Sequence, residues 1–231
     1  MTGQIIRRRW YSAALESGVA GLNVAYSPDL GFATVDEEIA ALVAAAAEIF
    51  TDLSARVTRV DPPLGDCTSV FDTHWHVGVA SAFEGLPDDK LKLLDPGLDH
   101  FVLEGRKISL MDYVAAQNAR TALGQAMRGF HEEYDLLILP TTAATAFPVE
   151  RRAPPGIGDD DWAAWSPFSY PFNLTMQPAL SVPAGFNRAG LPVGLQIVGA
   201  VHQDALVLRA GRAFERATEY GRQHPTRPQA G

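Results

Sequence analysis

Residues 22–31 read LNVAYSPDLG, a short apolar run followed by a turn. Pro28 fixes its own φ angle, and Gly31 tolerates the backbone conformation that the return of the chain requires. The apolar run, residues 22–26, is therefore predicted to be a short strand that ends at this turn.

A helix and a second strand are predicted after the turn. Thr34 or Asp36 can cap the helix, and apolar residues recur at helical spacing over residues 39–53. Residues 57–60 then form a second strand-like run. Because a helical crossover joins parallel strands, this unit predicts a parallel pair within a sheet.

The rest of the chain also alternates between helical and strand-like patterns, which favours an α/β protein whose helices cover a mixed sheet. Residues 85–97 are predicted to be a turn-rich connection, and residues 141–165 a long loop. The other predicted elements are helices over 68–83, 109–134 and 205–218, the last capped by Asp204, a buried strand over 135–140, and a hairpin of strands over 179–182 and 194–198.

The composition is that of an ordinary globular protein. Of the 231 residues, 47% are hydrophobic and 20% are charged, so the chain can form one large domain or two small ones. Its net charge of −8 argues against a nucleic-acid partner. The arginine clusters at residues 7–9 and 151–152 have no aromatic residues interleaved with them for base stacking.

Cysteine usage and hydropathy indicate the compartment. Cys67 is the single cysteine, so no internal disulfide can form, and no Cys/His spacing suggests a metal site. No apolar run approaches the ~20 residues of a membrane span, and the N-terminus lacks a signal-peptide pattern. We therefore expect a cytoplasmic protein with no membrane contact.

Several motifs, taken in order, resemble one known family. Residues 22–31 and 57–63 resemble the middle of amidase-signature enzymes, and the later motifs resemble their C-terminal region. The later motifs are DLLILPTT at 135–142, PFNLTMQP at 171–178, ALSVPAG at 179–185 and GLPVGLQIVG at 190–199. The resemblance implies a partial amidase-signature domain over residues 10–225, with an unmatched segment at 1–9 and a tail at 226–231.

The family implies cleavage of carboxamides by acyl transfer, using a serine nucleophile, a bridging serine and a lysine. In the family these groups precede the region matched here. The chain has no Gly-Gly-Ser-Ser run, and Lys90, Lys92 and Lys107 lie in no matching strand context. We therefore assign no catalytic residue and expect no cofactor, and we expect the chain to be inactive alone.

Arg120 is a candidate substrate-binding residue. In the amidotransferase branch of the family, an arginine at a similar place pairs with the carboxylate of glutamine, for which a guanidinium offers bidentate geometry. The alternative is a structural salt bridge. Ser166 stands where those enzymes place an acidic residue, so the resemblance does not extend to recognition of an α-amino group.

Trp165, Phe168 and Phe172, with Tyr170, form an aromatic cluster after the long loop. In the intact family this stretch lies near the substrate tunnel, where aromatic side chains can select an apolar or aryl amide. Simple core packing is the alternative.

His74 and His76 flank Trp75 in a way that suggests a metal site. On a helix, residues two apart point about 200° apart, so they cannot bind one ion. Because the surrounding pattern is helical, we expect no metal here.

Three hypotheses for the whole chain remain open. It can be the C-terminal part of an amide hydrolase, a non-enzymatic binding or scaffold protein, or a subunit completed in trans by an N-terminal chain. A half-sheet exposes strand edges and apolar surface, so we expect either a homo-oligomer or a complex with the missing N-terminal half. A complete enzyme would take a small-molecule amide.

Overall fold

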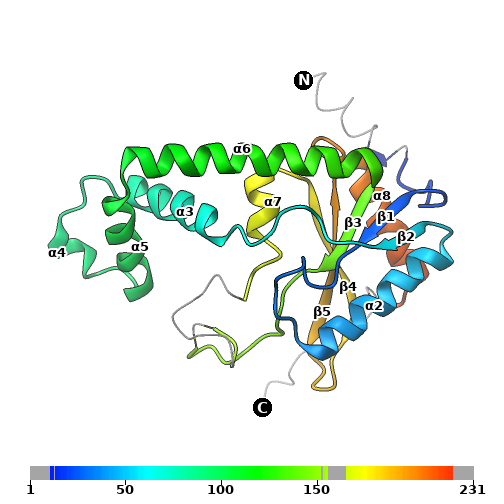
Figure 1. Cartoon of the computed structure of the whole chain (residues 1–231). Helices are drawn as coiled ribbons and strands as arrows, with labels where there is room; N and C mark the ends of the chain where they lie inside the picture. Colours follow the sequence, from blue (N-terminus) through cyan, green and yellow to red (C-terminus); the bar gives the residue numbers. More distant parts are fainter. Residues whose placement is uncertain (1–10, 13, 152, 156–164, 221–231) are drawn as a thin grey trace, which may run out of the picture.

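A computed structural model of the chain describes residues 11–12, 14–151, 153–155 and 165–220. Its centre is a five-stranded sheet with the strand order β2-β1-β3-β5-β4 (Figure 1). Seven helices are described, and they flank or extend this sheet. The strands are β1 (Asn23–Tyr26), β2 (Arg56–Arg59), β3 (Leu136–Pro140), β4 (Ala179–Phe186) and β5 (Pro192–Gly199), and the helices are α2 (Glu37–Asp52), α3 (Thr68–Ala82), α4 (Asp88–Leu91), α5 (Pro96–Lys107), α6 (Leu110–Glu133), α7 (Tyr170–Thr175) and α8 (Asp204–Ala217).

The sheet is mixed, as the sequence predicts. β1 runs parallel to β2 and to β3, whereas β5 runs antiparallel to both β3 and β4. The β4–β5 pair is the predicted hairpin, although both strands are longer than expected. Asp36 caps α2 by accepting hydrogen bonds from the backbone N–H groups of Glu38 and Ile39.

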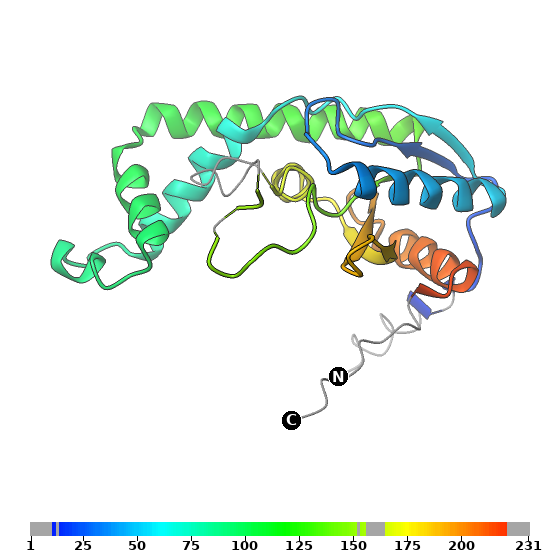
Figure 2. The same cartoon turned by 90° about the horizontal axis from the view of Figure 1, so that it is seen from below.

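Helices α2 and α8 cover one face of the sheet (Figure 2). Their apolar residues, including Phe50 and Phe214, pack against inward-facing side chains of β3, β4 and β5. The rings of Phe50 and Phe214 stack with centroids 5.7 Å apart. This face of the sheet is therefore covered over its width, up to and including the edge strand β4.

The second face is covered less completely. Met127 and Phe130 of α6, together with Phe168 and Phe172, pack over β1, β3 and the end of β5. The β4 side chains on this face are Ala179, Ser181 and Pro183, and all three are exposed. The described elements thus leave the β4 end of the second face open.

Helices α3, α4, α5 and the first half of α6 extend beyond the sheet as an arm (Figure 1). No residue of α3 is buried, and the buried hydrophobic side chains described in the arm are Leu91, Val102 and Ala116. Helices α3 and α5 cross closely, since a Cβ atom added at Gly105 would lie 2.0 Å from the carbonyl oxygen of His76.

Two predictions for local structure are wrong, and one helix was not predicted. Residues 85–97 are not wholly a turn-rich connection, because α4 lies within them and α5 starts at Pro96. Asp204 is the first residue of α8 rather than its cap, since Gln203 holds that position with no side-chain hydrogen bond. The short helix α7 was not expected. None of the helices in the described part of the chain is long and apolar enough to cross a membrane.

Candidate functional site

Helix α7 packs against α6 and α3 and is held by side chains from both helices. The hydroxyl oxygens of Tyr170 in α7 and Thr68 in α3 are 2.8 Å apart. The ring of Tyr170 also stacks on Phe71, with centroids 5.0 Å apart. Burial raises the pKa of Tyr170 to about 12, so its phenol is neutral near pH 7.

Arg120 holds the other end of α7. Its Nε donates a hydrogen bond of 2.8 Å to the carbonyl oxygen of Leu174, and the side chain is half-buried. Within the described residues, no hydrogen bond or ion pair is formed by the two terminal nitrogens of this guanidinium. Arg120 therefore combines a structural contact through Nε with two amino groups that can bind a carboxylate.

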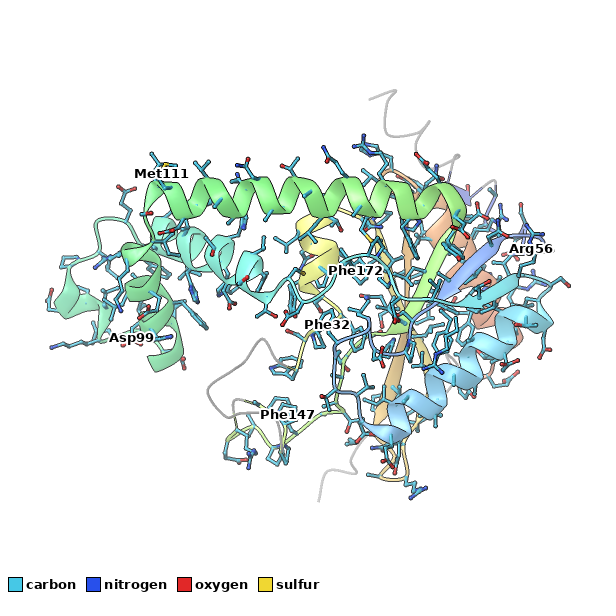
Figure 3. The ribbon with its side chains drawn as sticks, in the orientation of Figure 1. Phe32, Arg56, Asp99, Met111, Phe147 and Phe172 are labelled. Atoms are coloured by element: carbon cyan, nitrogen blue, oxygen red, sulfur yellow. The ribbon has the colours of Figure 1, made fainter. Side chains whose placement is uncertain are left out.

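The predicted aromatic cluster divides into two parts. Phe168 and Phe172 are buried in the core on the second face of the sheet. Figure 3 shows Phe172 on the side of α7 that faces the sheet. The carbonyl oxygen of Phe168 accepts a 2.8 Å hydrogen bond from the side-chain amide of Gln196. Trp165 lies apart, with its ring edge-on to Phe147 at 5.8 Å between centroids. Its buried Nε1 has no hydrogen-bond partner among the described residues.

A buried polar network lies where α6 ends, and the sequence analysis did not identify it. Nδ1 of His131 is 2.9 Å from the carbonyl oxygen of Tyr134, and Nε2 is 2.6 Å from Nε2 of Gln177. Thr175 donates to Oε1 of Gln177 at 2.7 Å. Burial is the main cause that lowers the pKa of His131 from its ordinary value. The network ties α6 to α7 and to the segment between α7 and β4.

A cavity of about 590 Å³ lies over this network, a volume within the usual range for small-molecule sites. Its lining combines polar and apolar side chains. It is lined by Thr121, Gly124, Gln125, Met127, Arg128, His131, Glu132, Thr175, Gln177, Ala200, Val201 and His202.

A pair of hydroxyl groups marks the open end of the sheet. Oγ1 of Thr141, directly after β3, is 2.8 Å from Oγ of Ser181 in β4. The pair crosses over Gly194 of the intervening strand β5. A Cβ at Gly194 would lie 2.6 Å from the Thr141 hydroxyl, so the arrangement requires glycine there.

The two histidines of α3 contact different neighbours. Nδ1 of His74 lies 2.7 Å from the carbonyl oxygen of Val70, and Nε2 lies 2.7 Å from the side-chain oxygen of Gln117. His76 instead stacks on Phe101. No group of three potential metal ligands occurs in the described part of the chain.

Comparison with known proteins gives the family. The Amidase family model matches residues 7–208. An acylamidase from Rhodococcus erythropolis is 33% identical over 224 residues, which cover 93% of this chain and 46% of that protein. The A subunit of the glutamyl-tRNA(Gln) amidotransferase from Halalkalibacterium halodurans is 39% identical over 116 residues, which cover 49% of this chain and 23% of that protein.

Solved structures agree with the sequence comparison. A bacterial aryl acylamidase of the amidase-signature family superposes with a TM-score of 0.79 and 28% identity, covering 92% of this chain and 46% of that one. A 6-aminohexanoate cyclic dimer hydrolase has the same fold, with a TM-score of 0.80 and 24% identity. The match covers 93% of this chain and 49% of that one. The chain thus spans about half the length of these relatives. The match along most of the chain, in sequence and in fold, shows that it belongs to the amidase family.

Proposed function

We propose that this chain is the C-terminal, substrate-side part of an amide hydrolase and is inactive until a second part supplies the nucleophile. The second part would bring the serine, bridging serine and lysine that the resemblance implies. The proposal is supported by the partial coverage of the acylamidase, of which the chain spans 46%.

The open end of the sheet is the observation that carries this proposal. β4 is an edge strand of eight residues with no charged side chain, and its second face is exposed. The opposite edge strand, β2, has four residues and carries Arg56 and Arg59. Proteins protect free edges with short strands and charges, which β2 has and β4 lacks. We infer that the second part pairs with β4 and covers Ala179, Ser181 and Pro183.

Arg120 and the aromatic residues would shape the substrate pocket of the completed enzyme. The terminal nitrogens of Arg120 would bind a carboxylate on the substrate, while Nε keeps α7 in place. Trp165 would form part of the pocket wall. Phe168 and Phe172, which are buried, would support that wall from behind.

The first experiment compares the chain alone with the chain mixed with the segment of the Rhodococcus acylamidase that it does not match. A panel of aryl and aliphatic amides and a fluorophosphonate serine probe provide the readouts. We expect no turnover and no labelled serine for the chain alone, and labelling of the added segment in the mixture. Turnover by the repurified chain, with a labelled serine of its own, would overturn the proposal.

Two variants at one position test the docking edge. Ser181→Lys places a charged side chain on the open face, whereas Ser181→Ala removes the hydroxyl pair without adding bulk or charge. We expect Ser181→Lys to prevent capture of the second part and Ser181→Ala to preserve it. Equal capture by both variants would show that β4 is not the docking edge.

The role of Arg120 is tested in the assembled enzyme. Arg120→Lys keeps a positive charge but loses the planar fork. We expect KM to rise about tenfold or more for amides that carry a carboxylate, with little change for neutral amides of similar size. An equal effect on both substrate classes would assign Arg120 a purely structural role.

A further inference from the structure

The outer face of α6 is unusual for a helix exposed to solvent. At 100° per residue, Met111, Val114, Asn118 and Gln125 fall within about 60° of one another, on the side opposite the core. A helix that packs on one side normally carries charged residues on the other. Between Leu110 and Gln125 the outer face of α6 carries none.

The two charged side chains in this stretch are used elsewhere. The carboxylate of Asp112 accepts hydrogen bonds from the backbone and hydroxyl of Ser109, as part of the N-terminal capping box. Arg120 bonds to Leu174 on the inner side of the helix. Neither charge therefore contributes to the outer face.

Large apolar side chains of α6 are exposed instead. Leu110 is 75% exposed, Met111 71% and Val114 40%. Figure 3 shows Met111 on the side of α6 that faces away from the other elements. Exposed apolar side chains gathered along one helix face indicate a contact surface.

We propose that this face binds a second copy of the chain, with the two α6 helices antiparallel across a two-fold axis at Asn118. Such an axis places Val114 against the partner's Ala122 and Ala115 against the partner's Thr121. It also places Met111 against the partner's Gln125. Larger side chains thus face smaller or flexible ones in each pair.

Asn118 would meet the partner's Asn118 on the axis. A side-chain amide offers both donors and an acceptor, so two identical amides can hydrogen-bond to each other. This self-complementarity is what a two-fold interface requires, because each patch must fit its own copy.

Charge also favours this face for self-association. Each copy carries a net charge of −8, so two copies repel each other over most orientations. The strip from Leu110 to Gln125 allows contact without placing like charges opposite each other.

The size of the strip predicts a weak dimer. Sixteen residues of helix are about 24 Å long and about 10–12 Å wide, which gives roughly 300 Å² per copy. A stable interface takes about 800 Å² per partner, so the dimer should form only at high micromolar concentrations. It does not involve β4, the edge assigned to the second part of the enzyme.

Sedimentation velocity of the full chain, from about 10 μM to about 1 mM, tests the proposal. Ala122→Arg and Ala217→Arg are matched variants, since both alanines are exposed in helices and only Ala122 lies on the α6 outer face. We expect the wild-type and Ala217→Arg chains to associate as concentration rises, and Ala122→Arg to stay monomeric. A wild-type monomer at about 1 mM, or equal association of both variants, would overturn the proposal.

Crosslinking gives a second readout, because a covalent bond traps a contact that is populated only part of the time. Cys67 is buried, and burial raises the pKa of its thiol to about 11, so it will not compete in oxidation near pH 7. Asn118→Cys is expected to give a covalent dimer on mild oxidation, whereas Ala217→Cys is not. Crosslinking of both at the same rate would show random collision rather than the proposed contact.

Discussion

Nε2 of His131 lies 2.6 Å from Nε2 of Gln177, a distance at which two nitrogens bond only if one offers a lone pair. The side-chain nitrogen of Gln177 also donates to the carbonyl oxygen of Gly199 at 3.3 Å, and this acceptor fixes the orientation of the amide. The amide must then donate to His131, whose single proton sits on Nδ1 and points at the carbonyl of Tyr134. The network therefore specifies a neutral His131.

This assignment predicts that acid destabilises the fold. Burial lowers the pKa of His131 below 6.5, against the opposing effects of the Tyr134 carbonyl and Asp135. The unfolded chain therefore holds more protons, and stability falls as pH drops through about 6.5 toward the folded pKa. We expect His131 to contribute at most about 1.4 kcal/mol per pH unit to this loss, measured by urea unfolding between about pH 7.5 and 5.5.

Two histidine variants separate this contribution from the general effect of acid. His131→Gln cannot titrate, so its stability should depend less steeply on pH than that of the wild type. His100→Gln is the matched control, because it changes an exposed histidine of α5 that lies outside this network. A wild-type slope in His131→Gln would mean that this histidine is not held neutral.

The Tyr170–Thr68 pair predicts unequal costs for its two partners. Tyr170→Phe leaves the hydroxyl of Thr68 bonded to Asp66, so we expect a loss of about 0.5–1.5 kcal/mol. Thr68→Val leaves the buried phenol without this partner and should cost more, about 1–3 kcal/mol. Urea unfolding of both variants and of the double variant measures the difference. A larger cost for Tyr170→Phe than for Thr68→Val would show that the phenol oxygen stabilises the fold through something other than its bond to Thr68.

Much of this fold could be predicted from local patterns. The turn at Pro28 and Gly31, the Asp36 cap and the apolar run of β3 depend on residues close together in sequence, and each was identified there. Helix α5 was missed because its start at Pro96 lies inside a turn-rich stretch. The expected cap at Asp204 failed because the chain enters the helix one residue earlier.

The candidate site was harder to predict because its contacts join distant residues. His131 and Gln177 are 46 residues apart, and Arg120 and Leu174 are 54 apart. Nothing in the local pattern around Gln177 indicates a buried amide. The resemblance drew attention to Arg120 and the aromatic residues but not to the network beneath the cavity.

Arg120 should also matter for stability in the chain alone. Arg120→Met keeps the apolar stem but leaves the Leu174 carbonyl without its charged donor, at an expected cost of about 1.5–3 kcal/mol. Arg128→Met is the matched control on the same helix, where the exposed side chain should change stability by less than about 0.5 kcal/mol. Equal unfolding midpoints for the two variants would show that the Leu174 contact contributes nothing.

Two glycines on neighbouring helices should respond to alanine in opposite directions. A Cβ at Gly105 would meet the backbone carbonyl of His76 at 2.0 Å and the Cβ of Ala80 at 2.7 Å, and neither atom can move without shifting α3. At Gly129 of α6 nothing lies within 4 Å. We expect Gly105→Ala to cost about 1–3 kcal/mol or more, and Gly129→Ala to gain about 0.5–1 kcal/mol from helix propensity.

Hydrogen exchange shows where the Gly105 change acts. Because the arm buries few residues, forcing α3 and α5 apart should increase exchange in both helices while the strands β3 and β5 keep their protection. Uniform loss of protection across the sheet would mean that the arm and the sheet unfold as one unit. Unchanged exchange in α3 would mean that a Cβ atom at Gly105 does not push against the backbone of His76.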